Sequence, residues 1–143
     1  MIKNILLVDD EDLFHLVFED ACSLLNISLS LEAMYSADEA ARMFHQIKDL
    51  PDKKPEVVFC DLNIIGSSFN GIELVNKINH EYGNGVVIGM ISSSCDEREI
   101  GKAMDAGAQF WIVKSDDIEP RLEEFYKDYA GYRDGTAPFK VYK

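Results

Sequence analysis

The sequence Val57-Val58-Phe59-Cys60-Asp61 places four consecutive apolar residues directly before a single acid. A strand that packs on both faces has such a continuous apolar run, whereas a half-exposed strand alternates between apolar and polar residues. Further runs of this kind span residues 5–8, 86–91 and 110–113. Together they predict a parallel sheet whose inner strands are covered on both faces.

Helical patterns separate these runs, and a weaker strand is predicted at residues 28–33. The fold class is therefore α/β, with five strands alternating with five helices and right-handed crossovers. Residues 1–130 make up this domain. Residues 131–143 fall outside the pattern, as a loose tail, the start of a linker, or a segment packed back on the body.

Several details of the helices are also predicted. A capping box of Ser36 and Glu39 is expected to open the second helix, and Gly107 to end the fourth. Asp116 or Asp117 is expected to cap the last helix. The first helix is expected to present Leu13, Val17, Ala21 and Leu24 on one apolar face, with Phe14, Phe18 and Leu25 beside it.

Composition excludes several classes of protein. The net charge of −12 disfavours binding to nucleic acid or to anionic membranes. The three cysteines are an odd number without CxxC spacing, which argues against a disulfide framework and against a zinc site. No apolar run is long enough to span a bilayer and no signal peptide is recognisable, so a cytoplasmic location is expected.

Polar residues follow the predicted strands at the points where they end. Asp9 and Asp10 follow the first strand, Asp61 the third, Ser92 the fourth and Lys114 the fifth. The carboxyl ends of parallel strands meet at one edge of a sheet, which is where open α/β folds bind ligands. These side chains are therefore predicted to converge on one site.

The charges of this site predict what it binds. Two like charges about 4 Å apart cost roughly 4 kcal/mol at an effective dielectric constant near 20, so three carboxylates need a cation. Lys114 supplies one positive charge. Oxygen ligands without nearby His or Cys favour Mg²⁺ for the remainder. A Mg²⁺ ion, an ammonium group and a hydroxyl together suit the binding of phosphoryl oxygens.

The segments ILLVDDED, VVFCDLN, MISSS and GAQFWIVKS resemble, in order and spacing, the signature segments of response-regulator receiver domains, including chemotaxis-type single-domain receivers. The resemblance covers residues 3–130. It implies a flavodoxin-like, doubly wound sheet with strand order 2-1-3-4-5. It also implies that the chain is a phosphoprotein of a two-component phosphorelay.

The resemblance further implies roles for individual residues. Asp61 matches the phosphoacceptor, which forms an aspartyl phosphate, and Asp10 and Asp9 match a direct and a water-mediated ligand of Mg²⁺. Asn63 matches the residue whose backbone carbonyl binds the metal. Three further positions match groups that respond to the phosphoryl group: the switch hydroxyl of Ser92, the amine of Lys114 and the switch aromatic residue, Trp111.

The sequence departs from the family pattern in three places. The loop after Asp61 lacks the usual Met-Pro and reaches Gly71 two residues later than in common members, which bears on access to Asp61. Ser115 stands where a proline usually follows the lysine, so Lys114 precedes either a costly non-proline cis bond or a trans bond that alters its reach. Trp111 is bulkier than the usual switch aromatic residue, which disfavours an inward position.

The leading functional hypothesis is a receiver that accepts a phosphoryl group from a sensor histidine kinase or a histidine phosphotransfer protein. It would signal to a downstream protein through altered contacts, and it would not be a turnover enzyme. Ile100 and Met104, with Trp111, would form a partner surface or, alternatively, belong to the ordinary core. A homodimer through the face of the fourth helix, fifth strand and fifth helix is also expected.

Two other functions compete with this hypothesis. The first is a pseudo-receiver, a constitutive protein-interaction module of the same fold, which the three departures favour. The second is a Mg²⁺-dependent phosphatase with an Asp nucleophile. Such phosphatases typically carry a second acid two residues after the nucleophile, where this chain has Asn63.

Overall fold

The computed structural model describes residues 4–27, 30–82 and 85–143. Its sheet has six strands, all parallel, in the order β2-β1-β3-β4-β5-β6. The strands are β1 (Asn4–Val8), β2 (Ser30–Met34), β3 (Val57–Cys60), β4 (Val87–Ser92), β5 (Phe110–Val113) and β6 (Lys140–Tyr142). The helices are α1 (Asp12–Leu24), α2 (Ala37–Ile47), α3 (Gly71–Glu81), α4 (Glu97–Ala106) and α5 (Glu119–Asp134), with a 3₁₀ turn at Pro51–Lys53.

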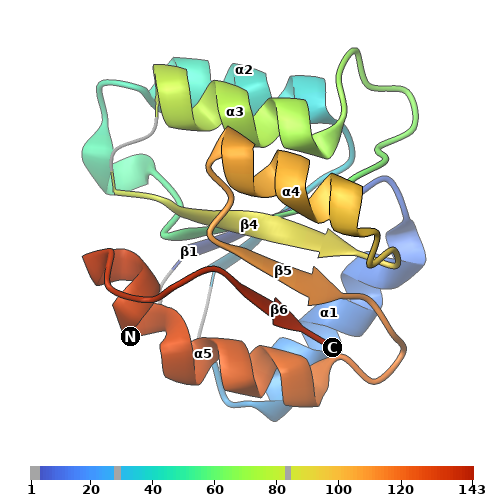
Figure 1. Cartoon of the computed structure of the whole chain (residues 1–143). Helices are drawn as coiled ribbons and strands as arrows, with labels where there is room; N and C mark the ends of the chain where they lie inside the picture. Colours follow the sequence, from blue (N-terminus) through green and yellow to red (C-terminus); the bar gives the residue numbers. More distant parts are fainter. Residues whose placement is uncertain (1–3, 28–29, 83–84) are drawn as a thin grey trace.

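Helices cover both faces of the sheet, as the continuous apolar strands predict. Helices α2, α3 and α4 lie on one face, and α1 and α5 lie on the other (Figure 1). Every residue of β3 and β4 is buried, because their side chains point alternately into the two cores. The flavodoxin-like architecture and the order 2-1-3-4-5 are therefore confirmed, with one strand added. No helix among the described residues is long and apolar enough to cross a membrane.

The added strand comes from residues 131–143. Helix α5 continues to Asp134, and β6 then pairs in parallel with β5, from Phe110↔Lys140 to Ile112↔Tyr142. The Tyr142 hydroxyl donates to Asp128 Oδ2 at 2.7 Å and lies 2.8 Å from the Tyr132 hydroxyl. Lys140 Nζ lies 2.6 Å from Glu124 Oε1. The segment is thus packed on the body, which is the third of the alternatives that the sequence leaves open.

Two expectations about the helices are wrong. On α1 the buried face carries Phe14 and Phe18, which were expected beside it, together with the expected Ala21, whereas Leu13 and Leu24 are 70% and 69% exposed. Leucines also lie on the exposed side of this helix, so the spacing of apolar residues alone does not identify the inner face, which the larger aromatic side chains occupy. Helix α5 begins after Ile118 without a side-chain cap and has a proline in its first turn, while Asp116 and Asp117 are exposed.

The predicted start of α2 is confirmed in one half of its capping box, and the predicted end of α4 is confirmed. Ser36 Oγ accepts a hydrogen bond from the Glu39 amide, which opens α2. Gly107 ends α4 with a φ of 103°, in the left-handed region that glycine favours. The predicted strand at residues 28–33 begins at Ser30, and its first two positions lie outside the described residues.

Candidate functional site

Parallel pairing brings the ends of β1 and β3 together. Val8 pairs with Cys60, so the following residues, Asp9 and Asp61, leave the sheet side by side. The backbone amide of Asp61 donates to the Val8 carbonyl at 2.9 Å, and that of Asp9 donates to the Met34 carbonyl at 3.0 Å. Both carboxylates are buried, Asp9 completely and Asp61 to all but 7% of its surface.

The amine of Lys114 lies between these two acids. Its Nζ is 2.5 Å from Asp9 Oδ2 and 3.2 Å from Asp61 Oδ2, and it also lies 4.5 Å from the centre of the Phe14 ring. The backbone of Lys114 is held by its amide, which donates to the Ser92 carbonyl at 2.8 Å. The predicted convergence of acids and an ammonium group at the carboxyl edge is therefore present in the structure.

The departure at Ser115 does not prevent this contact. None of the peptide bonds in the described residues is cis, so Lys114 is followed by a trans bond. Arg121 donates to the Ser115 hydroxyl, which ties the segment after β5 to the first turn of α5. Lys114 thus reaches both acids from a trans backbone.

A third carboxylate, Glu11, completes a group that suits a divalent cation. One carboxylate oxygen from each of Asp9, Glu11 and Asp61 lies within 4.8 Å of the others. Asp9 Oδ2 is buried, and its contact with Lys114 Nζ is an ion pair without an aligned hydrogen bond. Oxygen ligands with an excess of negative charge match the preference of Mg²⁺. The donor set therefore fits this ion.

The structure brings together two of the three side chains that were predicted to bind the metal. Asp9 and Asp61 belong to the group of three, whereas half-buried Asp10 does not, and Glu11 joins it instead. The Glu11 amide donates to Asp9 Oδ1 at 2.9 Å, and its carboxylate lies 3.7 Å from Lys114 Nζ. Glu11 was missed because it lies in the turn after the strand end, where spacing does not predict direction. The role of Asp10 as a ligand remains a prediction.

The site shifts the pKa values of two of its groups. Burial raises the pKa of Asp61 to about 6; the Lys114 charge opposes this shift, and the Asp9 charge adds to it. Burial alone would lower the pKa of Lys114, but its contacts with Asp9 and Asp61 outweigh burial and raise it. Lys114 therefore remains charged at neutral pH, while Asp61 binds a proton more readily than an ordinary aspartate.

The raised pKa of Asp61 predicts a pH dependence of stability. Because the folded state binds this proton more tightly than the unfolded state does, protonation stabilises the fold. In the metal-free protein, the stability of the wild type relative to Asp61→Asn should fall by about 2 kcal/mol between pH 4 and pH 7. Urea unfolding of both proteins at several pH values measures this difference. A constant difference would contradict the raised pKa.

Ser92 is the last residue of β4, and Trp111 lies within the neighbouring strand β5. Ser92 is buried, and its hydroxyl accepts a hydrogen bond from the Ser94 amide at 3.2 Å. The expectation that bulk disfavours an inward Trp111 is wrong, because its side chain is completely buried beneath α4 and its Nε1 donates to the Ser94 carbonyl at 3.0 Å. The indole finds both apolar packing and a hydrogen-bond partner there, which is how tryptophan is normally buried.

The expected partner surface of Ile100, Met104 and Trp111 therefore does not include Trp111 in this structure. Ile100 is partly buried against the core, and Met104 is 50% exposed, so these two remain accessible on α4. Trp111 belongs to the core in this structure. Recognition of a partner by the α4 face remains a prediction.

The loop between β3 and α3 passes close to Asp61. Asn63 is exposed, between the buried side chains of Leu62 and Ile64. Gly71, the first residue of α3, lies so near that a Cβ added to it would come within 1.9 Å of the Asp61 carbonyl oxygen. This contact explains why glycine stands at the end of the longer loop.

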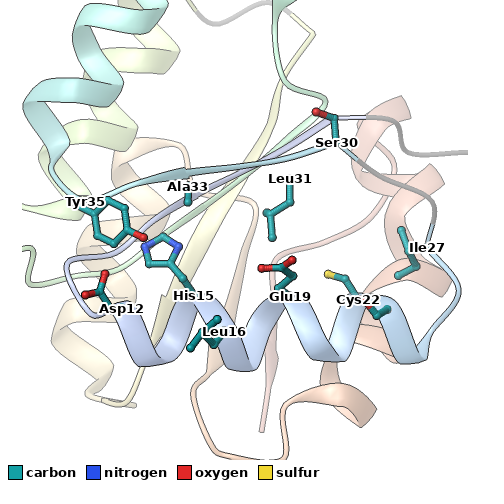
Figure 2. A pocket seen from close by; sticks show the side chains of 11 residues that line it. Asp12, His15, Leu16, Glu19, Cys22, Ile27, Ser30, Leu31, Ala33 and Tyr35 are labelled. Atoms are coloured by element: carbon teal, nitrogen blue, oxygen red, sulfur yellow. The ribbon is translucent and has the colours of Figure 1, made fainter.

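A separate hollow of about 710 Å³, whose lining does not include Asp61, lies between α1 and β2 (Figure 2). His15 is buried in its wall and donates through Nε2 to the Asp9 carbonyl at 2.8 Å. Its ring packs on that of Tyr35, with 4.4 Å between centres. This hydrogen bond to the backbone of Asp9 connects the wall of the hollow to the acidic site.

A protein family and several solved structures are similar to this chain. The family described as the response regulator receiver domain matches residues 5–124. The response regulator domain of Thermotoga maritima CheB is 21% identical, with a TM-score of 0.71, over 90% of this chain and 96% of that one. A LuxR-family two-component response regulator from Aurantimonas sp. is 25% identical, with a TM-score of 0.70, over 93% and 89%.

A response regulator from Burkholderia pseudomallei, solved with a phosphorylated aspartic acid, a calcium ion and citrate, is also similar. It is 18% identical, with a TM-score of 0.68, over 94% of this chain and 73% of that one. No curated protein matches the chain.

Proposed function

We propose that this chain, which belongs to the family of response regulator receiver domains, accepts a phosphoryl group on Asp61 with the help of Mg²⁺. The observation that carries the proposal is the position of Lys114 Nζ, 2.5 Å from Asp9 Oδ2 and 3.2 Å from Asp61 Oδ2. The ammonium group is thus held between two buried acids at this edge of the sheet. Such a group is also where a phosphoryl oxygen would find its counter-charge.

The chemistry assigned to Asp61 is nucleophilic. A carboxylate oxygen of Asp61 attacks phosphorus, an acyl phosphate forms, and the bond from phosphorus to the donor breaks. The Leu62 amide, which donates to Asp61 Oδ1 at 2.9 Å, fixes one oxygen and leaves Oδ2 facing Lys114. Asp9, Glu11 and Asp61 would hold Mg²⁺, which supplies charge stabilisation for the transferring group.

The solved relatives support the same assignment. The similar response regulator from Burkholderia pseudomallei contains a phosphorylated aspartic acid and a calcium ion. Calcium and magnesium are both hard cations that take oxygen ligands. We infer a comparable pairing of aspartyl phosphate and divalent cation for this chain.

The donor in the cell is inferred to be a sensor histidine kinase or a histidine phosphotransfer protein in the cytoplasm. The phosphorylated domain would then change its affinity for a downstream protein. Loss of the phosphoryl group to water would restore the starting state, so the domain acts as a timed signal and not as a turnover enzyme. Homodimerisation through the α4-β5-α5 face would have to accommodate β6, which pairs with β5.

One observation favours the pseudo-receiver as a second candidate. Trp111 is already buried and hydrogen-bonded to the Ser94 carbonyl, so the aromatic residue occupies an inward position in this structure. A domain fixed in that position would present one face at all times. The two candidates differ in whether Asp61 reacts.

Intact mass measurement separates them. The wild type treated with acetyl phosphate and Mg²⁺ should gain the mass of one phosphoryl group, while the same treatment with a chelator should give none. Asp61→Asn is the matched control and should stay unmodified under both conditions. A wild type that never gains this mass, although it is folded, would favour the pseudo-receiver.

A further inference from the structure

We propose that Ser67 and Asp38 are positioning residues for the Asp61 site, because they fasten the loop of residues 62–70 to the first turn of α2. The inference rests on the proposed function, since it concerns the Mg²⁺ that Asp61 would use. It assigns a task to the loop before Gly71, one of the three places where the sequence departs from the family pattern.

The loop is ordered first by its own turn and by apolar contacts. Ile64 is buried and Phe69 is partly buried against the core cluster beneath α2 and α3. The Ser67 amide donates to the Ile64 carbonyl at 3.2 Å, and Gly66 sits in this turn with a φ of 85°. The result is a tight turn whose tip exposes 82% of Ile65.

Two hydrogen bonds then join this turn to α2. Ser67 Oγ accepts from the Ala37 amide at 2.9 Å, and the Ser68 amide donates to Asp38 Oδ2 at 2.9 Å. The first four amides of a helix have no partner within the helix, so the Ala37 amide is available to the loop. Ser36 meanwhile caps the Glu39 amide. At the start of α2, the helix's own cap therefore binds the Glu39 amide, and the loop binds the Ala37 amide.

These bonds lie close to the proposed metal site along the chain. The loop is fixed at one end by Asp61 and by the Leu62 carbonyl, which accepts from the Gly71 amide, and beyond Leu62 its attachment to another element is the pair of bonds at Ser67 and Ser68. Asn63, the residue whose backbone carbonyl is predicted to bind Mg²⁺, lies between these attachments. Without the bonds to α2, the stretch that carries Asn63 would sample more arrangements.

The expected effect follows from populations. A ligand binds with an apparent affinity reduced by the fraction of protein in the competent arrangement. Each hydrogen bond contributes about 1 kcal/mol, which corresponds to roughly fivefold in an equilibrium constant. The loss of either bond should therefore weaken Mg²⁺ binding about three- to tenfold. The intrinsic reactivity of Asp61 should not change, because neither Ser67 nor Asp38 contacts that carboxylate.

The test measures Mg²⁺ binding to the unphosphorylated full chain by isothermal titration calorimetry. Ser67→Ala and Asp38→Ala each remove one acceptor and should raise the Kd about three- to tenfold. Ser68→Ala is the matched control, because Ser68 contributes its backbone amide and should bind as the wild type does. Asp38→Asn keeps an acceptor oxygen and should restore most of the affinity that Asp38→Ala loses.

A second measurement distinguishes positioning from general damage. Phosphorylation by acetyl phosphate, followed by intact mass, should be slow in Ser67→Ala and Asp38→Ala at low Mg²⁺ and should recover at saturating Mg²⁺. A rate that stays low at saturation, Mg²⁺ affinities equal to that of the wild type, or an equal loss in Ser68→Ala would each overturn the inference. A wild type that binds no Mg²⁺ and takes no phosphoryl group would instead refute the proposed function itself.

Discussion

Gly71→Ala is expected to lower the free energy of unfolding by about 1–3 kcal/mol or more and to impair the Asp61 site at the same time. The added Cβ would lie 1.9 Å from the Asp61 carbonyl oxygen and 2.8 Å from its carbonyl carbon. Both are backbone atoms, so no side-chain rotation can relieve the overlap. Either the start of α3 or the end of β3 must move, and overpacking of this kind costs about 1–3 kcal/mol or more.

The Asp61 site is impaired because the start of α3 and the segment after β3 are hydrogen-bonded to each other. The Gly71 amide donates to the Leu62 carbonyl at 2.9 Å, and the Leu62 amide donates to Asp61 Oδ1 at 2.9 Å. A shift at residue 71 therefore passes to the phosphoacceptor through a single intervening residue. We expect weaker Mg²⁺ binding and slower phosphorylation in addition to the loss of stability.

Gly101→Ala provides the matched control. Gly101 lies inside α4, where an added Cβ would meet nothing within 4 Å. Alanine favours the helix over glycine by about 0.5–1 kcal/mol, so this variant should gain stability. Urea unfolding of both variants gives the comparison. Equal stabilities for the two variants would show that the approach of Gly71 to Asp61 is not tight in solution.

Lys114→Met should destabilise the metal-free protein by about 3–5 kcal/mol at neutral pH. Removal of one partner from a buried ion pair leaves uncompensated buried charge, which is the costly case. Here Asp9 and Asp61 would face each other without a counter-charge. The pKa of Asp61 would rise further, so the cost should grow with increasing pH and shrink as Asp61 becomes protonated.

Magnesium should reverse part of this loss. A cation that binds the folded state alone stabilises it by about 2.7 kcal/mol at a concentration one hundred times its Kd. Thermal unfolding with and without Mg²⁺ should therefore show a larger gain in Tm for Lys114→Met than for the wild type, because the variant site carries one more net negative charge. A gain smaller than that of the wild type would contradict a metal held by these acids.

Lys77→Met is the control for the loss of a lysine as such. Lys77 pairs with Glu81 at 3.0 Å on the surface of α3, where both side chains are substantially exposed. Exposed pairs contribute about 0–1 kcal/mol. The variant should therefore unfold within about 1 kcal/mol of the wild type and should respond to Mg²⁺ as the wild type does.

The strand ends show how much of the site could be predicted from sequence. Asp9, Asp61 and Lys114 were predictable because they directly follow buried parallel strands, and register then brings them together. Glu11 was not, because the direction of a side chain in a turn depends on local hydrogen bonds such as that from its amide to Asp9 Oδ1. The attachment of the loop to α2 by Ser67 was likewise hidden, since the partners are thirty positions apart.

Other failures have different physical causes. Trp111 was expected to stay outside because of its size, but the Ser94 carbonyl satisfies its indole N–H within the core. The sixth strand has three residues, too few for periodicity to detect. Its position depends on tertiary contacts, such as the hydrogen bond from Tyr142 to Asp128.

The direction of β6 determines where attached probes would lie. Because β6 is parallel to β5, Lys143 leaves the sheet at the rim that carries Lys114, whereas Asn4 enters β1 at the opposite rim (Figure 1). A dye joined to the carboxyl end would therefore report on events near Asp61. An affinity handle placed there would crowd an incoming phosphodonor, so the amino end offers the more neutral point for immobilising the protein.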